Sequence, residues 1–157
     1  MPIYRYRREL AYPIPASASI QPYTLRHLRV PADVPALHAL LNETYIARGA
    51  TLEPCDRWWQ TVSSDPEFDM RLAFVVETPA ATLAAAGIAW NSGFVKDLAV
   101  APAYRRQGLG VALLAHIWRT FDAMGAHAVD LKVDAGNQAA IALYDAAGMR
   151  RVETIGS

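Results

Sequence analysis

Apolar and polar residues alternate along short segments of the chain, which is typical of strands with one buried face. The segment YTLRHL, residues 23–28, alternates in this way, and apolar segments at 71–77, 83–90 and 93–100 follow it. Turn-forming residues, Thr78-Pro79 and Asn91-Ser92-Gly93, separate these three segments. The pattern therefore predicts one strand and then an antiparallel meander of three strands.

Apolar residues at helical spacing occupy the remaining segments. After Pro31-Ala32-Asp33 an amphipathic stretch runs through Tyr45, and further helices are predicted at 54–62, 110–124 and 138–147. Gly125 and Gly148 stop the last two helices, and strands at 128–133 and 149–155 follow them. This order predicts an α/β (α+β) fold with a mixed central sheet flanked by helices, and not a doubly wound sheet.

The length, charge and cysteine content restrict the classes of function that the sequence allows. A chain of 157 residues that is 53% hydrophobic and 19% charged is expected to fold as one globular domain. Because 15 basic and 15 acidic residues cancel, we expect neither a nucleic acid nor a membrane as partner. Cys55 is the single cysteine, which excludes an internal disulfide, favours a cytoplasmic setting and offers no thiolate metal site.

The charges are unevenly distributed. Residues 30–100 carry four basic and nine acidic residues, a net charge of −5. Together with Trp58, Trp59 and Trp90 this segment could form a pocket for a cationic amine. The alternative is that these aromatic residues belong to the core beneath an ordinary surface.

The most informative stretch is KDLAVAPAYRRQGLG, residues 96–110, in which a predicted strand leads into a glycine-bearing helix start. Glycines at 108 and 110 would let the amides of 106–111 point at one anion, with the helix dipole in support. This predicts a phosphate-binding loop, although a plain tight turn is the alternative. No Lys-Ser/Thr follows the glycines, so a Walker loop is excluded, and Leu113 stands where a dinucleotide fingerprint needs a small residue.

Three motifs in order resemble the GCN5-related N-acetyltransferases (GNAT). Arg105, Gly108 and Gly110 match that family's coenzyme loop, DLAV (97–100) precedes it, and VDAGNQAAIALYDAAGM (133–149) is similar to its last coenzyme-binding region. The resemblance extends over about residues 23–155 and implies a mostly antiparallel sheet with a splayed strand pair. It further implies acetyl-CoA as cosubstrate, and direct acetyl transfer in a ternary complex to a small-molecule amine or a peptide N-terminus.

The resemblance also assigns roles to residues. It implies that the main chain of Leu98 and Val100, and the side chain of Asn137, bind the pantetheine arm, and that the Tyr144 hydroxyl meets the departing thiolate. Without the family, Asn137 would be a helix cap and Tyr144 a core residue. The expected coenzyme-binding residues are Leu98, Ala99, Val100, Arg105, Arg106, Gln107, Gly108, Leu109, Gly110, Val111 and Asn137.

The general base is the least determined part of the site. Asp97 is the nearest candidate, on a strand face expected to be shared with Val95 and Ala99, and a purely structural carboxylate is the alternative. Glu77 and His116 are weaker candidates. An ammonium group must lose a proton before it attacks a thioester, so some such group is required.

The chain departs from the family at its ends. The family's sheet has one more strand after the one predicted at 149–155, so this sheet is expected to be atypically short at the C-terminus. Residues 3–8, IYRYRR, alternate as a strand does. We expect residues 1–22 to be an extension that docks on its own subunit or on a partner in a homodimer, and residues 23–157 to be the acetyltransferase domain.

Two other functions stay open from the sequence. One is a non-catalytic acyl-CoA sensor or scaffold. The other, less favoured, is a nucleotide-dependent oxidoreductase built on Gly108 and Gly110.

Overall fold

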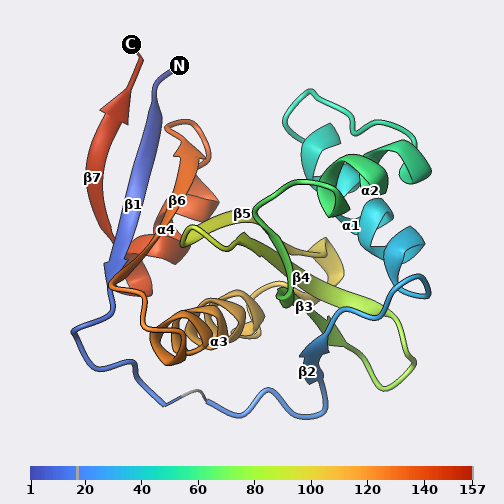
Figure 1. Cartoon of the computed structure of the whole chain (residues 1–157), viewed down its shortest axis with the longest axis horizontal. Helices are drawn as coiled ribbons and strands as arrows, with labels where there is room; N and C mark the ends of the chain where they lie inside the picture. Colours follow the sequence, from blue (N-terminus) through green and yellow to red (C-terminus); the bar gives the residue numbers. More distant parts are fainter. Residues whose placement is uncertain (17, 157) are drawn as a thin grey trace.

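The computed structural model describes residues 1–16 and 18–156. Over these residues the chain forms one seven-stranded sheet, in the order β2-β3-β4-β5-β6-β1-β7, with four α-helices and one short 3₁₀ helix (Figure 1). The strands are β1 (Ile3–Glu9), β2 (Thr24–His27), β3 (Phe68–Glu77), β4 (Leu83–Trp90), β5 (Phe94–Val100), β6 (Ala128–Asp134) and β7 (Arg150–Ile155). The helices are α1 (Val34–Ile46), α2 (Cys55–Ser63), η1 (Pro102–Tyr104), α3 (Leu109–Ala123) and α4 (Gln138–Ala146).

The predicted α+β fold with a mixed sheet is confirmed. Strands β2 to β5 form an antiparallel series, and the β5–β6 pair is parallel. The predicted helices and strands match the observed ones within a few residues at each end. The largest difference is at β3, which begins at Phe68 rather than at Arg71, because Phe68 pairs with Trp90 beyond an irregularity in the β3–β4 register.

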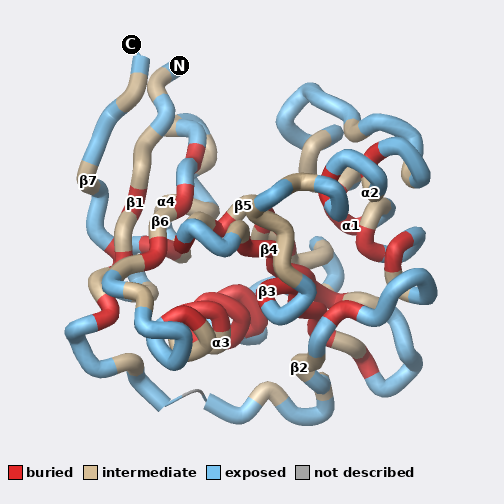
Figure 2. The backbone as a smooth tube through the Cα atoms, viewed as in Figure 1, coloured by how far each residue is buried: buried red, intermediate tan, exposed pale blue. Residues whose placement is uncertain are grey.

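Helices cover both faces of the sheet (Figure 2). The apolar stripe of α3 is buried, with Leu113, Leu114 and Ile117 fully enclosed in the larger core cluster. A second cluster joins α1 and α2 to the other face and includes Leu37, Leu41 and Trp58. The two helical layers thus fix the position of β5, which lies near the middle of the sheet.

The N-terminal segment forms a strand inside the sheet. β1 lies between β6 and β7 and is antiparallel to both, so Tyr6 faces Leu131 on one side and Arg151 on the other. The side chain of Arg7 donates to Asp130 through Nε at 2.7 Å, which ties β1 to β6. β1 therefore pairs with strands of its own chain, while the division of the chain after residue 22 and a homodimer stay predictions.

Strands β5 and β6 splay apart. They pair only at Phe94–Asp130 and Val95–Leu131 and then diverge, as the family resemblance implies. A register shift between Ile88 and Ala89 of β4 leaves Lys96 as an extra residue in β5, which is a β-bulge. The expectation that Val95 shares a face with Asp97 is therefore wrong, because Val95 belongs to the α3-side cluster whereas Asp97 turns toward α1.

Candidate active site

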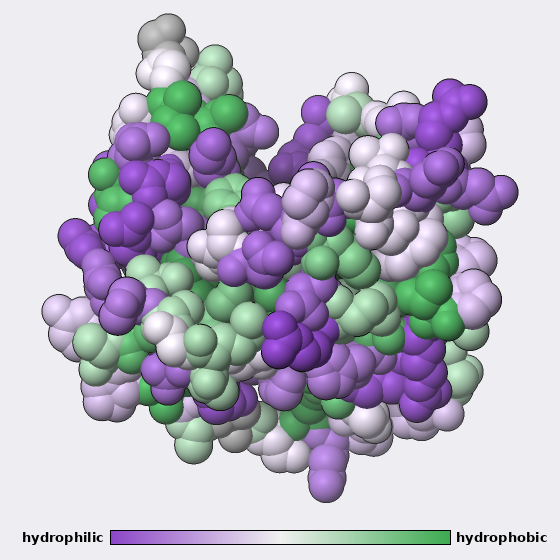
Figure 3. All heavy atoms as spheres, viewed as in Figure 1, coloured by the Kyte–Doolittle hydropathy of each residue, from purple (hydrophilic) through white to green (hydrophobic). Residues whose placement is uncertain are grey.

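The divergence of β5 and β6 opens a cleft of about 250 Å³. Residues of α1, β5, β6 and α4 line it, together with Arg48, just after α1, and Asn137, just before α4. In Figure 3 the surface is hollowed between the arm that holds β6, β1 and β7 and the arm that holds α1 and α2. Five of the expected site residues line this cleft: Asp97, Leu98, Ala99, Asn137 and Tyr144.

The open edge of β5 presents main-chain groups to the cleft. The amide of Ala101 donates to the Ala84 carbonyl at 2.8 Å, so alternate residues from Ala101 backwards face β4. The main-chain groups of Leu98 and Val100 consequently face away from β4, toward the gap. Ala99 has the opposite orientation, and its side chain is buried against the α1 side of the sheet.

The loop after β5 leaves a run of amides without partners. Arg106 and Gly108 both have a positive φ, +64° and +79°, and Gly108 caps the start of α3. Among the described residues, no carbonyl or side chain accepts a hydrogen bond from the amides of 106–111, and Ala112 is the first to donate, to the Gly108 carbonyl at 3.0 Å. Six successive amides and a helix N-terminus can thus converge on one anion.

Two close contacts shape this loop. A Cβ added at Gly110 would lie 3.1 Å from Cδ2 of Leu143, so a glycine lets α3 approach α4 closely. The Arg105 side chain folds back and donates through Nε to the Val100 carbonyl at 3.1 Å. Arg106 and Gln107 are exposed, whereas Leu109 is buried in the core and anchors the helix start.

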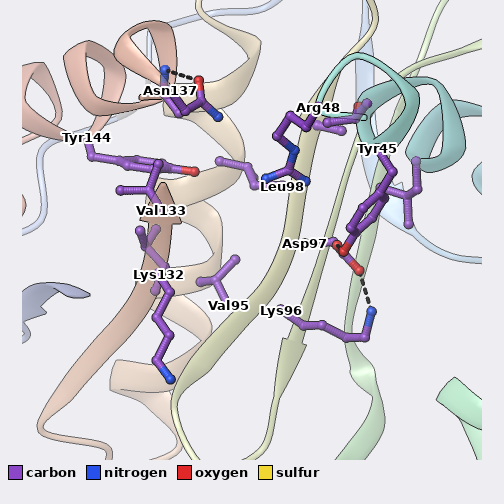
Figure 4. Close-up of a pocket in the computed structure, with 15 residues that line it drawn as sticks. Tyr45, Arg48, Val95, Lys96, Asp97, Leu98, Lys132, Val133, Asn137 and Tyr144 are labelled. Atoms are coloured by element: carbon purple, nitrogen blue, oxygen red, sulfur yellow. Dashed lines mark hydrogen bonds and ion pairs between the residues drawn. The ribbon is translucent and has the colours of Figure 1, made fainter. Parts of the chain in front are cut away.

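Asn137 is both a helix cap and a cleft residue. Its Oδ1 accepts a hydrogen bond from the amide of Ala140 at 3.2 Å, which caps α4. The side chain also lines the cleft, so its amide nitrogen can donate there while the oxygen holds the helix (Figure 4).

The Tyr144 hydroxyl points into the cleft from α4 (Figure 4). The residue is 7% exposed, and burial raises the pKa of its hydroxyl to about 12. Tyr6 of β1 packs against its ring at 6.1 Å between centroids, which helps to fix its orientation. The hydroxyl therefore stays protonated at neutral pH and can donate a hydrogen bond into the cleft.

Asp97 is buried on the opposite wall. Its carboxylate accepts hydrogen bonds from the Tyr45 hydroxyl at 2.9 Å and from Nζ of Lys96 at 2.6 Å. Burial, and then the negative charge of Asp97, raise the pKa of Tyr45 to about 12. The bulge at Lys96 thus turns the carboxylate toward α1, where it joins a polar network beside the cleft.

The weaker base candidates lie elsewhere. Glu77 accepts a hydrogen bond from Nη2 of Arg26 at 2.8 Å and lies on β3, which β4 separates from β5, so it does not line the cleft. His116 packs edge-on against Phe74, with ring centroids 4.6 Å apart, and lines a separate surface cavity with His27.

The tryptophans and the acidic segment do not form the pocket either. Trp58 and Trp59 pack in the α1–α2 cluster, Trp90 lies at the end of β4, and none of them lines the cleft. Of the nine acidic residues in 30–100, only Asp97 does. Among the described residues no cluster suits a metal ion, and no helix is long and apolar enough to cross a membrane.

Several cleft residues could not be identified from the sequence. Tyr45 lies in the last turn of α1 and Arg48 just after that helix, about 50 positions before Asp97, and Lys132 lies on β6. Helical periodicity indicates that α1 packs on the sheet, but it does not show that its last turn ends over the gap.

The structure is that of an α+β protein in which two central strands diverge, with a run of unpaired amides after the first of them that can bind an anionic ligand. The model of the acetyltransferase (GNAT) family matches residues 34–149, so this chain belongs to that family.

The similar proteins differ in how much they share with this chain. The [ribosomal protein bS18]-alanine N-acetyltransferase of Escherichia coli K12 is 48% identical over 52 residues, which cover 33% of this chain and 35% of that protein. The crystal structure of that E. coli enzyme has a TM-score of 0.63 and 28% identity, over 83% of this chain and 79% of that one.

Two further solved structures share the fold. A GCN5-related N-acetyltransferase from Sphaerobacter thermophilus has a TM-score of 0.83 at 23% identity, over 98% of this chain. This chain spans only 49% of the Sphaerobacter protein. AAC(6')-Iy, solved with a bisubstrate analogue, has a TM-score of 0.66 at 13% identity, over 86% of this chain and 95% of its own.

Proposed function

We propose that this protein transfers an acetyl group from acetyl-CoA to a primary amine by direct attack within a ternary complex. The observation that carries the proposal is the run of unpaired amides at 106–111, beside a cleft into which the Tyr144 hydroxyl points. Membership of the GNAT family supports the same chemistry. Acetyl-CoA would supply the thioester, and the residues of this chain would bind and orient it.

Main-chain groups would make most of the contacts with the coenzyme. The amides of 106–111 and the dipole of α3 would bind the pyrophosphate, with Arg105 and Arg106 beside it. The main-chain groups of Leu98 and the carbonyl of Val100, which also accepts from Arg105, would pair with the pantetheine arm as with a neighbouring strand. Asn137 would donate from the other side. The main-chain groups of Ala99 face β4, so this residue would line the coenzyme site without a hydrogen bond to the coenzyme.

Three groups would act on the reacting atoms. The Val100 amide would donate to the thioester oxygen as negative charge develops on it. Asp97 would take the first proton that the ammonium releases, the amine nitrogen would form the new bond to carbon, and the carbon–sulfur bond would break. Tyr144 would then hydrogen-bond to the departing sulfur. The second proton on that nitrogen would pass through solvent water to the thiolate, which gives the free thiol of CoA.

The pKa of Tyr144 limits its role. At about 12 the pKa of the hydroxyl lies well above that of a thiol, about 8.5, so complete proton transfer to a thiolate is unfavourable. We therefore propose that Tyr144 stabilises the thiolate as a hydrogen-bond donor, which loses no proton itself.

The relatives suggest the range of acceptors. The E. coli enzyme is named for an alanine of a ribosomal protein, and AAC(6')-Iy was solved with CoA-S-monomethyl-acetylneamine. We propose a primary amine, on a small molecule or at a peptide N-terminus, as the acceptor of this chain.

We also propose a homodimer, because the outer edge of β7 has no strand partner in the described residues. Size-exclusion chromatography tests this proposal. The lone Cys55 supports a reducing compartment such as the cytoplasm, which localisation of a tagged chain tests.

The deciding experiment combines binding and turnover. Acetyl-CoA at 100 times its dissociation constant is expected to stabilise the chain by about 2.7 kcal/mol, whereas nicotinamide cofactors leave the thermal midpoint unchanged. Free thiol should then be released when a panel of primary amines is added. Binding without thiol release for any amine would favour a sensor, and stabilisation by a nicotinamide cofactor alone would favour an oxidoreductase.

A pair of glycine variants tests the loop itself. Gly108 and Gly125 both have a positive φ, +79° and +84°, and an added Cβ meets nothing within 4 Å at either position. Gly108→Ala and Gly125→Ala should therefore lose a similar stability, about 1 kcal/mol. Only Gly108→Ala should weaken acetyl-CoA binding, because it displaces the unpaired amides. Equal affinities in the two variants would contradict the proposed phosphate site.

A further inference from the structure

Arg48 places a guanidinium in the cleft without an anionic partner. Six other arginines, among them Arg26 and Arg71, pair with carboxylates at 3.8 Å or less. Among the described residues no carboxylate lies within that distance of Arg48, which instead stacks over the ring of Tyr45 with Cζ 4.9 Å from its centroid. An arginine in a cleft without a carboxylate is available to bind an anionic group of a ligand.

The other charges of the cleft increase its positive potential. Arg48, Lys96 and Lys132 line it together with one carboxylate, that of Asp97. Lys96 and the Tyr45 hydroxyl already donate to that carboxylate, at 2.6 Å and 2.9 Å. The site therefore has an excess of positive charge, which disfavours a polycationic acceptor and reverses the expectation from the acidic composition of residues 30–100.

The orientation of Arg48 places this charge opposite the proposed reaction centre. In Figure 4 the side chains of Arg48 and Tyr144 extend toward each other from opposite walls, with Leu98 of β5 between them. A group held by Arg48 would thus lie on the α1 side of the cleft, while the β5 edge at Leu98 stays open to the thioester. The cleft volume of about 250 Å³ suits a small acceptor.

We propose that the acceptor is a small primary amine that carries an anionic group, a carboxylate or a phosphate, and that Arg48 binds this group. The inference rests on the proposed acetyl transfer and adds the class of acceptor to it. Arg48 would hold the anion bidentately, and the neighbouring amino group would lie beside the β5 edge. Arg48 would then determine specificity and would not act on the reacting atoms.

The test compares amines that differ in one charge. Thiol release is measured for β-alanine against β-alaninamide, and for 2-aminoethyl phosphate against 2-aminoethanol, with rates corrected for the fraction of free amine. We expect the anionic member of at least one pair to have a kcat/KM higher by about 10-fold or more, the effect of one charge-assisted hydrogen bond. Comparison of the two pairs shows whether carboxylate or phosphate is preferred.

Variants link the preference to Arg48. Arg48→Gln should remove it, and Arg48→Lys should keep part of it, where the preference is the ratio of kcat/KM for the anionic amine to kcat/KM for the neutral one measured on the same variant. The control is Arg57→Gln, because Arg57 lies on α2 outside the cleft with a side chain that is 74% exposed. This control should behave as the unchanged protein does.

A binding measurement separates this inference from the proposed function. In the presence of saturating CoA, the anionic amine should raise the thermal midpoint of the unchanged protein but not that of Arg48→Gln. Equal shifts for anionic and neutral amines, or a preference that survives in Arg48→Gln, would overturn the inference even if acetyl transfer occurs. An Arg48-dependent shift without any thiol release would instead refute the proposed transfer and leave the anion site in place.

Discussion

Replacement of Tyr144 by phenylalanine removes one hydroxyl from the cleft and little else. The ring is 7% exposed and packs against Tyr6, and phenylalanine keeps that packing. Burial raises the pKa of the hydroxyl, the charge of Arg48 opposes this, and no hydrogen-bond partner among the described residues contributes, so loss of the hydroxyl leaves no buried partner unsatisfied. Stability at neutral pH should therefore change by less than about 0.5 kcal/mol.

Turnover should respond much more strongly than stability. A hydrogen bond to a charged group contributes about 1.5–3 kcal/mol, which corresponds to a decrease in kcat of about 10- to 150-fold if the hydroxyl stabilises the departing thiolate. The dissociation constant of acetyl-CoA should stay within about twofold, since an uncharged sulfur gains little from the hydroxyl. The assay is thiol release under saturating acetyl-CoA, with calorimetry for binding and Tyr12→Phe, at a position that is 66% exposed, as control.

The pH dependence of the stability of Tyr144→Phe tests whether the hydroxyl is buried. The folded pKa of Tyr144 is about 12, above the value of about 10 expected in the unfolded chain. Because the unfolded chain loses this proton first, the stability contributed by the group is fully present below pH 10 and is lost as pH rises toward 12, by about 2–3 kcal/mol. Urea unfolding should show a smaller loss over this range for Tyr144→Phe than for Tyr12→Phe.

Two results would refute the reasoning about Tyr144. A kcat within threefold of that of the unchanged protein would mean that the hydroxyl does not stabilise the leaving group. Parallel pH–stability curves for the two phenylalanine variants would mean that the Tyr144 hydroxyl is hydrated and not buried.

Three further predictions concern charge and the N-terminal strand. If Asp97 is the base, Asp97→Asn should lower kcat by about 100-fold or more at neutral pH. The activity should recover in part at alkaline pH, where free amine is abundant. A loss of activity that does not depend on pH would indicate a structural role for Asp97. The hydrogen bond from Arg26 lowers the pKa of the Asp33 carboxyl. The ionised carboxylate therefore stabilises the fold above about pH 4, and this stability is lost as pH falls through the folded pKa. Asp33→Asn should therefore cost about 1–3 kcal/mol at pH 7 by urea unfolding, with a smaller difference at pH 3, and a constant difference would contradict the assignment. Deletion of residues 2–20 removes β1 from between β6 and β7, so the thermal midpoint and solubility should fall; an unchanged midpoint and oligomeric size would show that the strand is dispensable.

Local patterns were sufficient to predict most of the fold. The helix over 110–124 and the meander of β3, β4 and β5 could be predicted because apolar spacing, glycine stops and turn residues agree along those segments. The position of β1 between β6 and β7 could not be predicted. Alternation shows that a segment is a strand, but it does not show which of several distant edges the strand completes.

The residues of the candidate site could also be predicted only in part. Asp97, Leu98, Asn137 and Tyr144 all line the cleft and belong to contiguous motifs next to the loop. Arg48 could not be found because it lies far from those motifs in sequence and its role depends on where α1 ends.

One error and one open alternative in the site also depended on tertiary structure. A single inserted residue, Lys96, separated Val95 from the face of Asp97, and no local pattern marks such a bulge. The sequence left two alternatives open for Trp58, Trp59 and Trp90, an acceptor pocket or the core, and the structure supports the core.

The place of β1 affects how the chain folds during synthesis. Tyr6 is synthesised about 125 and 145 positions before its neighbours in the sheet, Leu131 and Arg151. Until those residues emerge, the first strand has no edge to join, and loop closure over such distances is slow. Over that interval the nascent protein exposes a strand-forming segment, to which chaperones can bind.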